Sequence, residues 1–415
     1  MRRDFLIALV ALATLFGSIV AAGGTLRERD ERLRGYIDPT QNADLPFRIP
    51  RLGINAELTQ YSADDLPAQF DLMESAQVHW VRQFVRWDEI ESAQGEFDWS
   101  AWDQIVGAFE GRDLELVVVL INTPEWARSM SADSTAPPDD PADFAHFAAA
   151  FAERYSEPVD YYQIWDEPNL TAAWGGLEPR PADYAALLQA GYTAIHGSDA
   201  DATVIAAALA PTTENTLLNI SDIVYLDDLY RLGAADFADA FAAKPYGFNL
   251  SSNDTTVDPD ALNFSRIVAL REIMLKYGDG RSALWASNWG WNTLPTDWTG
   301  SPSLWGGVTS EQHIAYTLSA LDRANREWAW LGGMILHHWQ PNAPCGDPQW
   351  GFALIDCAGI ATPLYHSLHS RPRPAHATTG VHPVTSPDAA YYGVWTFSPL
   401  GADIGWIDDS RATFT

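Results

Sequence analysis

Eight short apolar runs of β type alternate along the chain with longer segments of helical pattern. The runs are RLGIN (51–55), HWVRQFV (79–85), LELVVVLI (114–121), VDYYQIW (159–165), TVIAAAL (203–209), ADAFAAK (238–244), SALWAS (282–287) and GGMILHHW (332–339). Most runs are apolar enough to be buried on both faces, as in a parallel sheet covered by helices. Eight such units predict an α/β fold, a (β/α)8 barrel over residues 49–370. An open doubly wound sheet is the competing fold, but no glycine-rich phosphate loop follows the first run.

The helical pattern between the runs is clearest over residues 141–155. Phe144, Phe147, Phe151 and Tyr155 recur there at helical spacing. We expect these aromatic side chains to belong to the core, because one apolar stripe is the face that a helix packs against a sheet.

Both ends of the chain depart from the repeating pattern. Residues 1–22 begin Met-Arg-Arg and continue as an apolar run, which predicts a secretory signal peptide or an uncleaved membrane anchor. Residues 23–48 are charged and then proline-rich, as in a linker. Residues 371–415 predict a short β-rich extension, either the first strands of an incomplete β-sandwich domain or strands packed on the barrel. We therefore expect an extracytoplasmic protein, secreted or anchored to the outer face of the cell membrane.

Acidic residues outnumber basic ones by 55 to 25, which gives a formal net charge of −30. Such a charge repels phosphate backbones, so nucleic acid is not an expected partner. Solubility, or adaptation to salt or acid, also accounts for this charge.

The two cysteines, Cys345 and Cys357, lie twelve positions apart. In an oxidising compartment they are expected to form a disulfide that closes a short loop, with two free thiols as the alternative. Without clustered histidines they do not make a zinc site, and no metal is expected.

The segment YYQIWDEPNL (161–170) is the most informative motif. It brings a carboxyl group, Glu167, to the end of a strand, and Pro168 prevents the strand from continuing. The sequence here resembles the clan A retaining glycoside hydrolases, which include β-xylosidases and endoglucanases and whose fourth strand ends in Trp-Asn-Glu-Pro. Five further segments match landmarks of that group in the same order: WVRQFVRWDEIESAQGEFDW (80–99), INTPEWA (121–127), KPYGF (244–248), ASNWGW (286–291) and GFALIDCAGIATPLYHSL (351–368).

The resemblance implies roles for particular side chains. Glu167 would be the general acid/base, and Asp166 would bind the sugar 2-hydroxyl group. Arg82 matches the arginine that orients the nucleophile, and Tyr246 matches a tyrosine near the active site. Trp339 matches the aromatic residue that forms the floor of the sugar subsite.

Seven tryptophans lie near the predicted strand ends, where stacking on sugar faces would need them; the alternative is that about half of them are core residues. They are Trp87, Trp126, Trp165, Trp174, Trp289, Trp291 and Trp339. Trp291 is, with Trp339, a predicted substrate-binding residue.

Two positions depart from the family pattern. Asn288 stands where the family has its nucleophilic glutamate, and Lys244 replaces the histidine of His-Pro-Tyr-Gly. A neutral amide does not form a glycosyl-enzyme, and loss of one member of a catalytic unit lowers the rate by about 10⁴ to 10⁶. A nearby Lys244 would also favour the ionised form of Glu167, which is a poor proton donor.

Three functions follow from these residues, all with an oligo- or polysaccharide as partner and no cofactor. The first is a glycoside hydrolase acting on β-linked glycans through Glu167, with a displaced carboxylate such as Glu214 or Asp297 as the second group. The second is a substrate-assisted hydrolase of N-acetylated sugars that uses Asp166 and Glu167, with Asn288 bonding the acetamido oxygen. The third is a catalytically impaired pseudoenzyme that binds glycans.

Overall fold

The protein folds as a closed barrel of eight parallel strands, as the sequence predicts. This computed structural model describes residues 52–328 and 330–371, part of the segment 14–23, and four short strands between 391 and 414. Each barrel strand pairs with its sequence neighbours and β1 closes the ring on β8. The strands are β1 (Leu52–Ala56), β2 (Trp80–Arg86), β3 (Glu115–Ile121), β4 (Tyr161–Asp166), β5 (Thr203–Leu209), β6 (Ala240–Ala243), β7 (Ala283–Trp289) and β8 (Leu331–Leu336).

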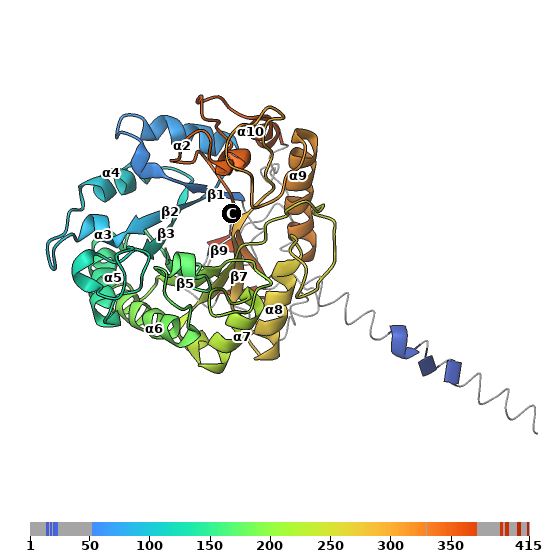
Figure 1. Ribbon diagram of the computed structural model, residues 1–415, viewed down its shortest axis with the longest axis horizontal. Helices are drawn as coiled ribbons and strands as arrows, with labels where there is room; N and C mark the ends of the chain where they lie inside the picture. The colour runs from blue at the N-terminus through green and yellow to red at the C-terminus, as the bar shows by residue number, and fades with distance from the viewer. Residues whose placement is uncertain are drawn as a thin grey trace, which may run out of the picture.

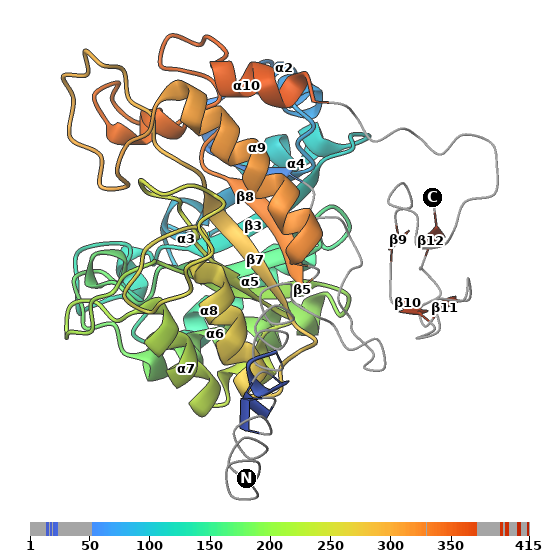
Figure 2. The ribbon, with the colours of Figure 1, turned by 90° about the vertical axis from the view of Figure 1, so that its right-hand side faces the viewer.

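Helices surround the strands and bury their outer faces (Figure 1). The α-helices are α2 (Leu66–Ser75), α3 (Trp87–Ile90), α4 (Ser100–Phe109), α5 (Pro141–Tyr155), α6 (Pro181–Ser198), α7 (Asp222–Arg231), α8 (Arg266–Lys276), α9 (Ser310–Glu327) and α10 (Pro363–His369). Short 3₁₀ turns are η1 (Leu58–Gln60), η2 (Glu125–Ala127), η3 (Thr171–Ala173), η4 (Ala234–Phe237) and η5 (Pro348–Phe352). Figure 2 views the side of the barrel that α8 and α9 cover.

Helix α5 has the bounds that its pattern predicts. Asp140 caps its first turn by accepting a hydrogen bond from the Ala142 amide, and Pro141 fills the first helical position, where no amide hydrogen is needed. The four aromatic residues of its apolar stripe are all buried. Local sequence and tertiary packing therefore agree over this helix.

Aromatic side chains close the barrel at the amino ends of the strands. Trp80 packs edge-on against Tyr161 and Trp285, with ring centroids 4.8 and 5.0 Å away. Gly332 and Gly333 on β8 leave room for this cluster, because a Cβ atom at either would overlap the Trp285 indole. We call Trp80, Tyr161 and Trp285 the floor of the barrel.

The chain ends are described only in part. The described residues of the segment 14–23 are helical; the rest of the predicted signal or anchor (1–22) and the predicted linker (23–48) lie outside the described residues. Within the described ranges, every helix is too short or too polar to cross a bilayer. In the β-rich extension, β9 (Tyr391–Tyr392) pairs with β12 (Thr413–Phe414), and β10 (Trp395–Phe397) pairs with β11 (Gly405–Ile407), both antiparallel.

Candidate active site

Charged and amide side chains gather at the carboxyl ends of the barrel strands, opposite the floor. Arg82 of β2 is their centre: its guanidinium donates to Asn55 (2.7 Å), Gln163 (3.1 Å) and Asp166 (2.8 Å). All four side chains are buried. In a barrel of this type the carboxyl ends of the strands are where ligands bind, so this is the candidate site.

Lys244, which follows β6, holds both carboxylates of the Asp-Glu pair. Its Nζ donates to Asp166 Oδ2 at 2.6 Å and to Glu167 Oε1 at 2.8 Å. The side chains of Lys244 and Asp166 are 5% and 9% exposed, whereas Glu167 is 29% exposed. We call Arg82, Asp166, Glu167 and Lys244 the charged cluster; Glu167 is its most accessible member.

The backbone at the end of β4 explains how adjacent residues reach different places. Trp165 and Glu167 have φ angles of 67° and 50°, in the left-handed region that costs energy for side chains larger than glycine. Trp165 packs against Phe144 of α5 and is fully buried, while Asp166 pairs with Arg82 at the barrel axis. The Glu167 amide still donates to Ala208 of β5 (2.9 Å), which fixes the carboxyl group beside Lys244.

The motifs KPYG and NWGW pack directly on each other. The amide of Gly247 donates to Gly290 (3.0 Å), and Tyr246 forms a parallel bridge with that same glycine. A side chain at Gly247 would overlap the Trp291 indole, so glycine is required for this contact. These contacts bring the ends of β6 and β7 together, and with them Lys244 and Asn288.

Asn288 lies among neutral groups. Its Nδ2 lies 3.2 Å from His337 Nδ1. Burial lowers the pKa of His337 well below its usual value, helped by His338, Lys244 and Arg82, and burial lowers the pKa of His338 to about 4. Burial raises the pKa of Tyr246 well above 10, with the carboxylates of Glu167 and Asp166 adding to the effect. At neutral pH this half of the site is therefore uncharged.

The two acidic loop residues that the sequence analysis proposed as the second catalytic carboxylate are exposed to solvent. Glu214 and Asp297 are exposed, and Glu214 accepts a hydrogen bond from Asn219 of its own loop (2.6 Å). Neither belongs to the charged cluster.

The tryptophans correct the expectation of a sugar-stacking surface. Of the seven, only Trp126 is partly exposed to solvent; the side chains of the other six are at most 1% exposed. Trp291 donates to the Leu250 carbonyl (2.7 Å), and Trp339 donates to Gln69 (3.1 Å) and packs near Tyr365 of α10. Both side chains are enclosed by protein in this structure, and the side chain beside Asn288 is His337.

Two half-buried aromatic residues that the sequence did not single out border the site. The Phe84 ring lies between the guanidinium groups of Arg82 (5.1 Å) and Arg86 (5.9 Å). Trp305, in the loop after β7, lies 6.1 Å from Tyr246 and 6.3 Å from His337 between ring centroids. The position of Phe84 could have been predicted from the sequence, because it lies two residues after Arg82 and residues two apart on a strand share a face. The position of Trp305 could not, because its loop has no periodic pattern.

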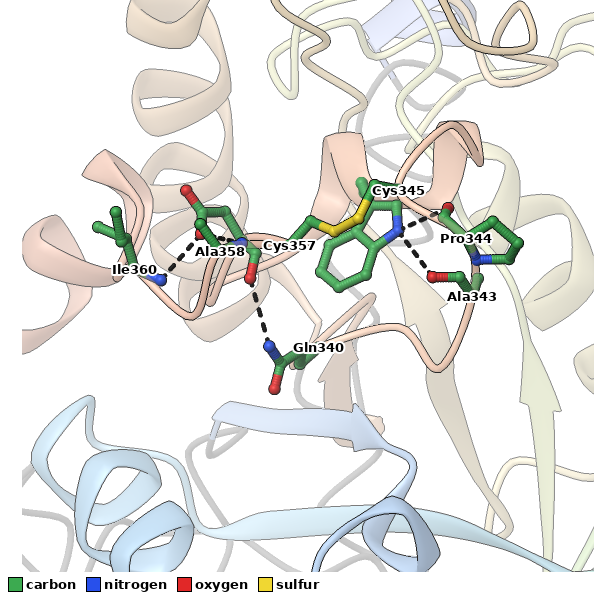
Figure 3. Close-up of a disulfide and its surroundings, with 9 residues drawn as sticks. Gln340, Ala343, Pro344, Cys345, Cys357, Ala358 and Ile360 are labelled. Atoms are coloured by element: carbon green, nitrogen blue, oxygen red, sulfur yellow. Dashed lines mark hydrogen bonds between the residues drawn. A yellow bond between two sulfur atoms is a disulfide. The ribbon is translucent and has the colours of Figure 1, made fainter.

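The loop after β8 is closed by a disulfide between Cys345 and Cys357 (Figure 3), whose Cα atoms are 5.7 Å apart. Gln340 donates to the Asp356 carbonyl (3.3 Å) across the base of the same loop. The predicted disulfide between the two cysteines is therefore present, and neither thiol is free.

Comparison with known proteins gives matches among solved structures alone. No protein-family model and no curated protein matches the chain. It is similar to a family 39 glycoside hydrolase from the gut symbiont Bacteroides cellulosilyticus WH2 (17% identity, TM-score 0.60), covering 78% of this chain and 63% of that one, less than two thirds of its length. It is also similar to a monomeric β-xylosidase from Caulobacter crescentus CB15 (19% identity, TM-score 0.58; 80% and 69% covered) and to a glucosidase from Croceicoccus marinus (15% identity, TM-score 0.56; 79% and 68% covered). The chain therefore has the (β/α)8 barrel fold of these glycoside hydrolases.

Proposed function

We propose that this protein binds an oligo- or polysaccharide at the mouth of a glycoside hydrolase-like barrel and does not cleave it by the retaining mechanism. The observation that carries the proposal is the position of Lys244 Nζ, which donates to both carboxylates of the Asp-Glu pair. In this ion pair Glu167 Oε1 accepts a hydrogen bond from Lys244.

Retaining hydrolysis needs two carboxyl groups about 5 to 5.5 Å apart, one to protonate the leaving oxygen and one to attack the sugar. Asn288 offers an amide in the second role, and its neighbours His337 and Tyr246 are neutral. Without a carboxylate there, the covalent step has no nucleophile.

The charges of the site balance without such a carboxylate. Arg82 and Lys244 supply two positive charges, and Asp166 and Glu167 supply two negative ones. A charge buried without a partner is strongly unfavourable, and this cluster leaves none. The arrangement is therefore stable as it stands and suits a ligand that brings no charge of its own.

The exposed groups around the cluster fit sugar recognition. Glu167 presents a partly exposed carboxylate that can accept hydrogen bonds from hydroxyl groups, and Phe84 and Trp305 are half-buried aromatic rings. Aromatic faces beside a few fixed polar groups are the usual composition of a sugar site. The shared fold with a β-xylosidase and a glucosidase supports a carbohydrate ligand.

The substrate-assisted alternative needs Asp166 to be free to orient an acetamido group. Asp166 accepts hydrogen bonds from Arg82, Gln163 and Lys244 (2.8, 3.2 and 2.6 Å). Both of its carboxylate oxygens are thus engaged within the protein, which argues against that route.

We place the protein outside the cytoplasm, secreted or anchored at the outer face of the membrane. The apolar segment 1–22 and the disulfide support this location, since disulfides persist in oxidising compartments.

The test is a panel of aryl β-glycosides with activated leaving groups, together with calorimetric titration of neutral oligosaccharides. We expect saturable binding and no product, with or without added azide. Turnover by the wild-type protein that disappears in Glu167→Ala would contradict the proposal, because it would require a second catalytic group.

A further inference from the structure

We propose that a cavity between the loops after β7 and β8 is a second binding site, for a neutral sugar or a similar polyol. Its volume is about 800 Å³, within the range of roughly 300 to 1,000 Å³ typical of ligand pockets. Its walls are residues 292–296 and 306–309, the first turn of α9, four residues of the loop after β8 (Trp350, Gly351, Ala353 and Asp356) and residues 362–364. None of the four residues of the charged cluster lines it, so the inference does not rest on the function proposed above.

Hydrogen bonds between the two loops build the cavity in the absence of a ligand. The Thr293 amide donates to Gly351 (2.9 Å), and the Asn292 side chain donates to the Pro348 carbonyl (2.7 Å). The Ser301 amide donates to Gly346 (3.0 Å), next to the disulfide. A preformed cavity avoids the entropy cost of ordering loops on binding.

One wall combines an aromatic ring with hydroxyl groups. Trp350 is half-buried, and its Nε1 donates to the carbonyls of Ala343 and Pro344 (3.3 and 3.0 Å) in the loop that the disulfide closes. Eight further lining side chains carry hydroxyl or apolar groups: Thr293, Leu294, Pro295, Thr296, Val308, Ser310, Thr362 and Leu364. A sugar presents the same combination, an apolar ring face and a hydroxyl edge.

The charges of the lining favour an uncharged ligand. Among the described lining residues there is no lysine or arginine, whereas Glu311 and Asp356 are acidic. His313 is buried, and burial lowers its pKa to about 4, so it is neutral at physiological pH. The amino end of α9 is occupied by its own capping box, in which Thr309 and Gln312 bond each other's backbone amides. Phosphate or carboxylate ligands would therefore meet repulsion and no free cation.

The experiment is calorimetric titration with xylotriose and cellotriose as neutral probes and glucuronic acid as the anionic probe. Trp350→Ala removes the aromatic wall, and Gly307→Leu adds a side chain where a Cβ atom meets nothing within 4 Å. Trp298→Ala is the matched control, because Trp298 is a half-buried tryptophan of the β7–α9 loop outside the cavity lining. Thermal unfolding of each variant checks that it is folded.

We expect Trp350→Ala and Gly307→Leu each to weaken neutral-sugar binding by about tenfold, and Trp298→Ala to leave it unchanged. Neutral-sugar binding that is absent, or unaffected by both cavity variants, would overturn the inference. So would glucuronic acid binding as tightly as the neutral sugars.

Discussion

The floor and the mouth of this barrel are held together by different forces. At the floor, the aromatic rings of Trp80, Tyr161 and Trp285 pack against one another. At the mouth, the charged cluster comes from β2, the end of β4 and the residue after β6, and each charge depends on a partner. Packed apolar groups can be changed singly at a cost set by volume, whereas paired charges act as a unit.

The sharpest test of the mouth as a unit is the triple variant Asp166→Asn, Lys244→His, Asn288→Glu. It puts the family residue at all three positions, removes the lysine that holds Glu167 and supplies the second carboxyl group, so we expect hydrolysis of aryl β-glycosides at least about 10³-fold above the wild-type rate. Asn288→Glu alone adds an unbalanced carboxylate and should stay inactive and lower the melting temperature. Equal activity of the single and triple variants would show that the three positions are independent.

At the floor, Trp285→Ala should lower the free energy of unfolding by about 4 kcal/mol, because it empties the centre of the aromatic cluster. Chemical denaturation measures this loss. Since a Cβ atom at Gly332 overlaps the Trp285 indole, Gly332→Ala should be destabilising in the wild type and nearly neutral in Trp285→Ala. Additive losses would contradict the packing account.

At the mouth, Lys244→Met should cost about 3 kcal/mol of unfolding free energy, because Glu167 and Asp166 lose a shared cation that is itself only 5% exposed. The double variant Lys244→Met, Glu167→Gln removes one carboxylate as well and should recover part of the loss. If denaturation finds both variants equally stable, the ion pair is not what holds Glu167.

Residues at the mouth, but not those at the floor, should make the free energy of unfolding depend on pH in mild acid. The pKa of His338 is lowered to about 4 in the folded protein, so the unfolded chain binds the extra proton between about pH 6.5 and pH 4. Stability is present above that window and is lost as the pH falls through it. His338→Gln should reduce the loss between pH 7 and pH 5 by about 2 kcal/mol, while the floor variant Trp285→Phe should keep the wild-type dependence. Parallel unfolding curves for wild type and His338→Gln would refute this.

Much of the barrel could be predicted from the sequence, because the signals for its strands and helices each act over a few residues. Apolar runs of strand length, the aromatic stripe over 141–155 and the proline after Glu167 each act within a few residues, and the eight strands and α5 appear where these signals place them. Glu167 could be predicted to lie at the mouth for the same reason, since the adjacent Pro168 ends β4.

The local signals did not indicate which side chains at the strand ends are exposed and which are buried by other segments of the chain. Trp291 and Trp339 stand at strand ends as sugar-binding residues would, yet Gly247 and the Leu250 carbonyl enclose one, and Gln69 and Tyr365 enclose the other. His337 and Trp305 border the site instead; His337 lies in the predicted eighth run, whereas Trp305 lies in a loop without a periodic pattern.

By itself, the sequence determined the order of strands and helices, the barrel they close into, and the two residues, Lys244 and Asn288, that set this chain apart. Tertiary structure alone decided that Lys244 joins Asp166 and Glu167 and that most of the tryptophans are core. The reason is physical: strand and helix signals act over a few residues, whereas ion pairs and burial join residues far apart in the chain, as with Lys244 and Asp166 (78 positions).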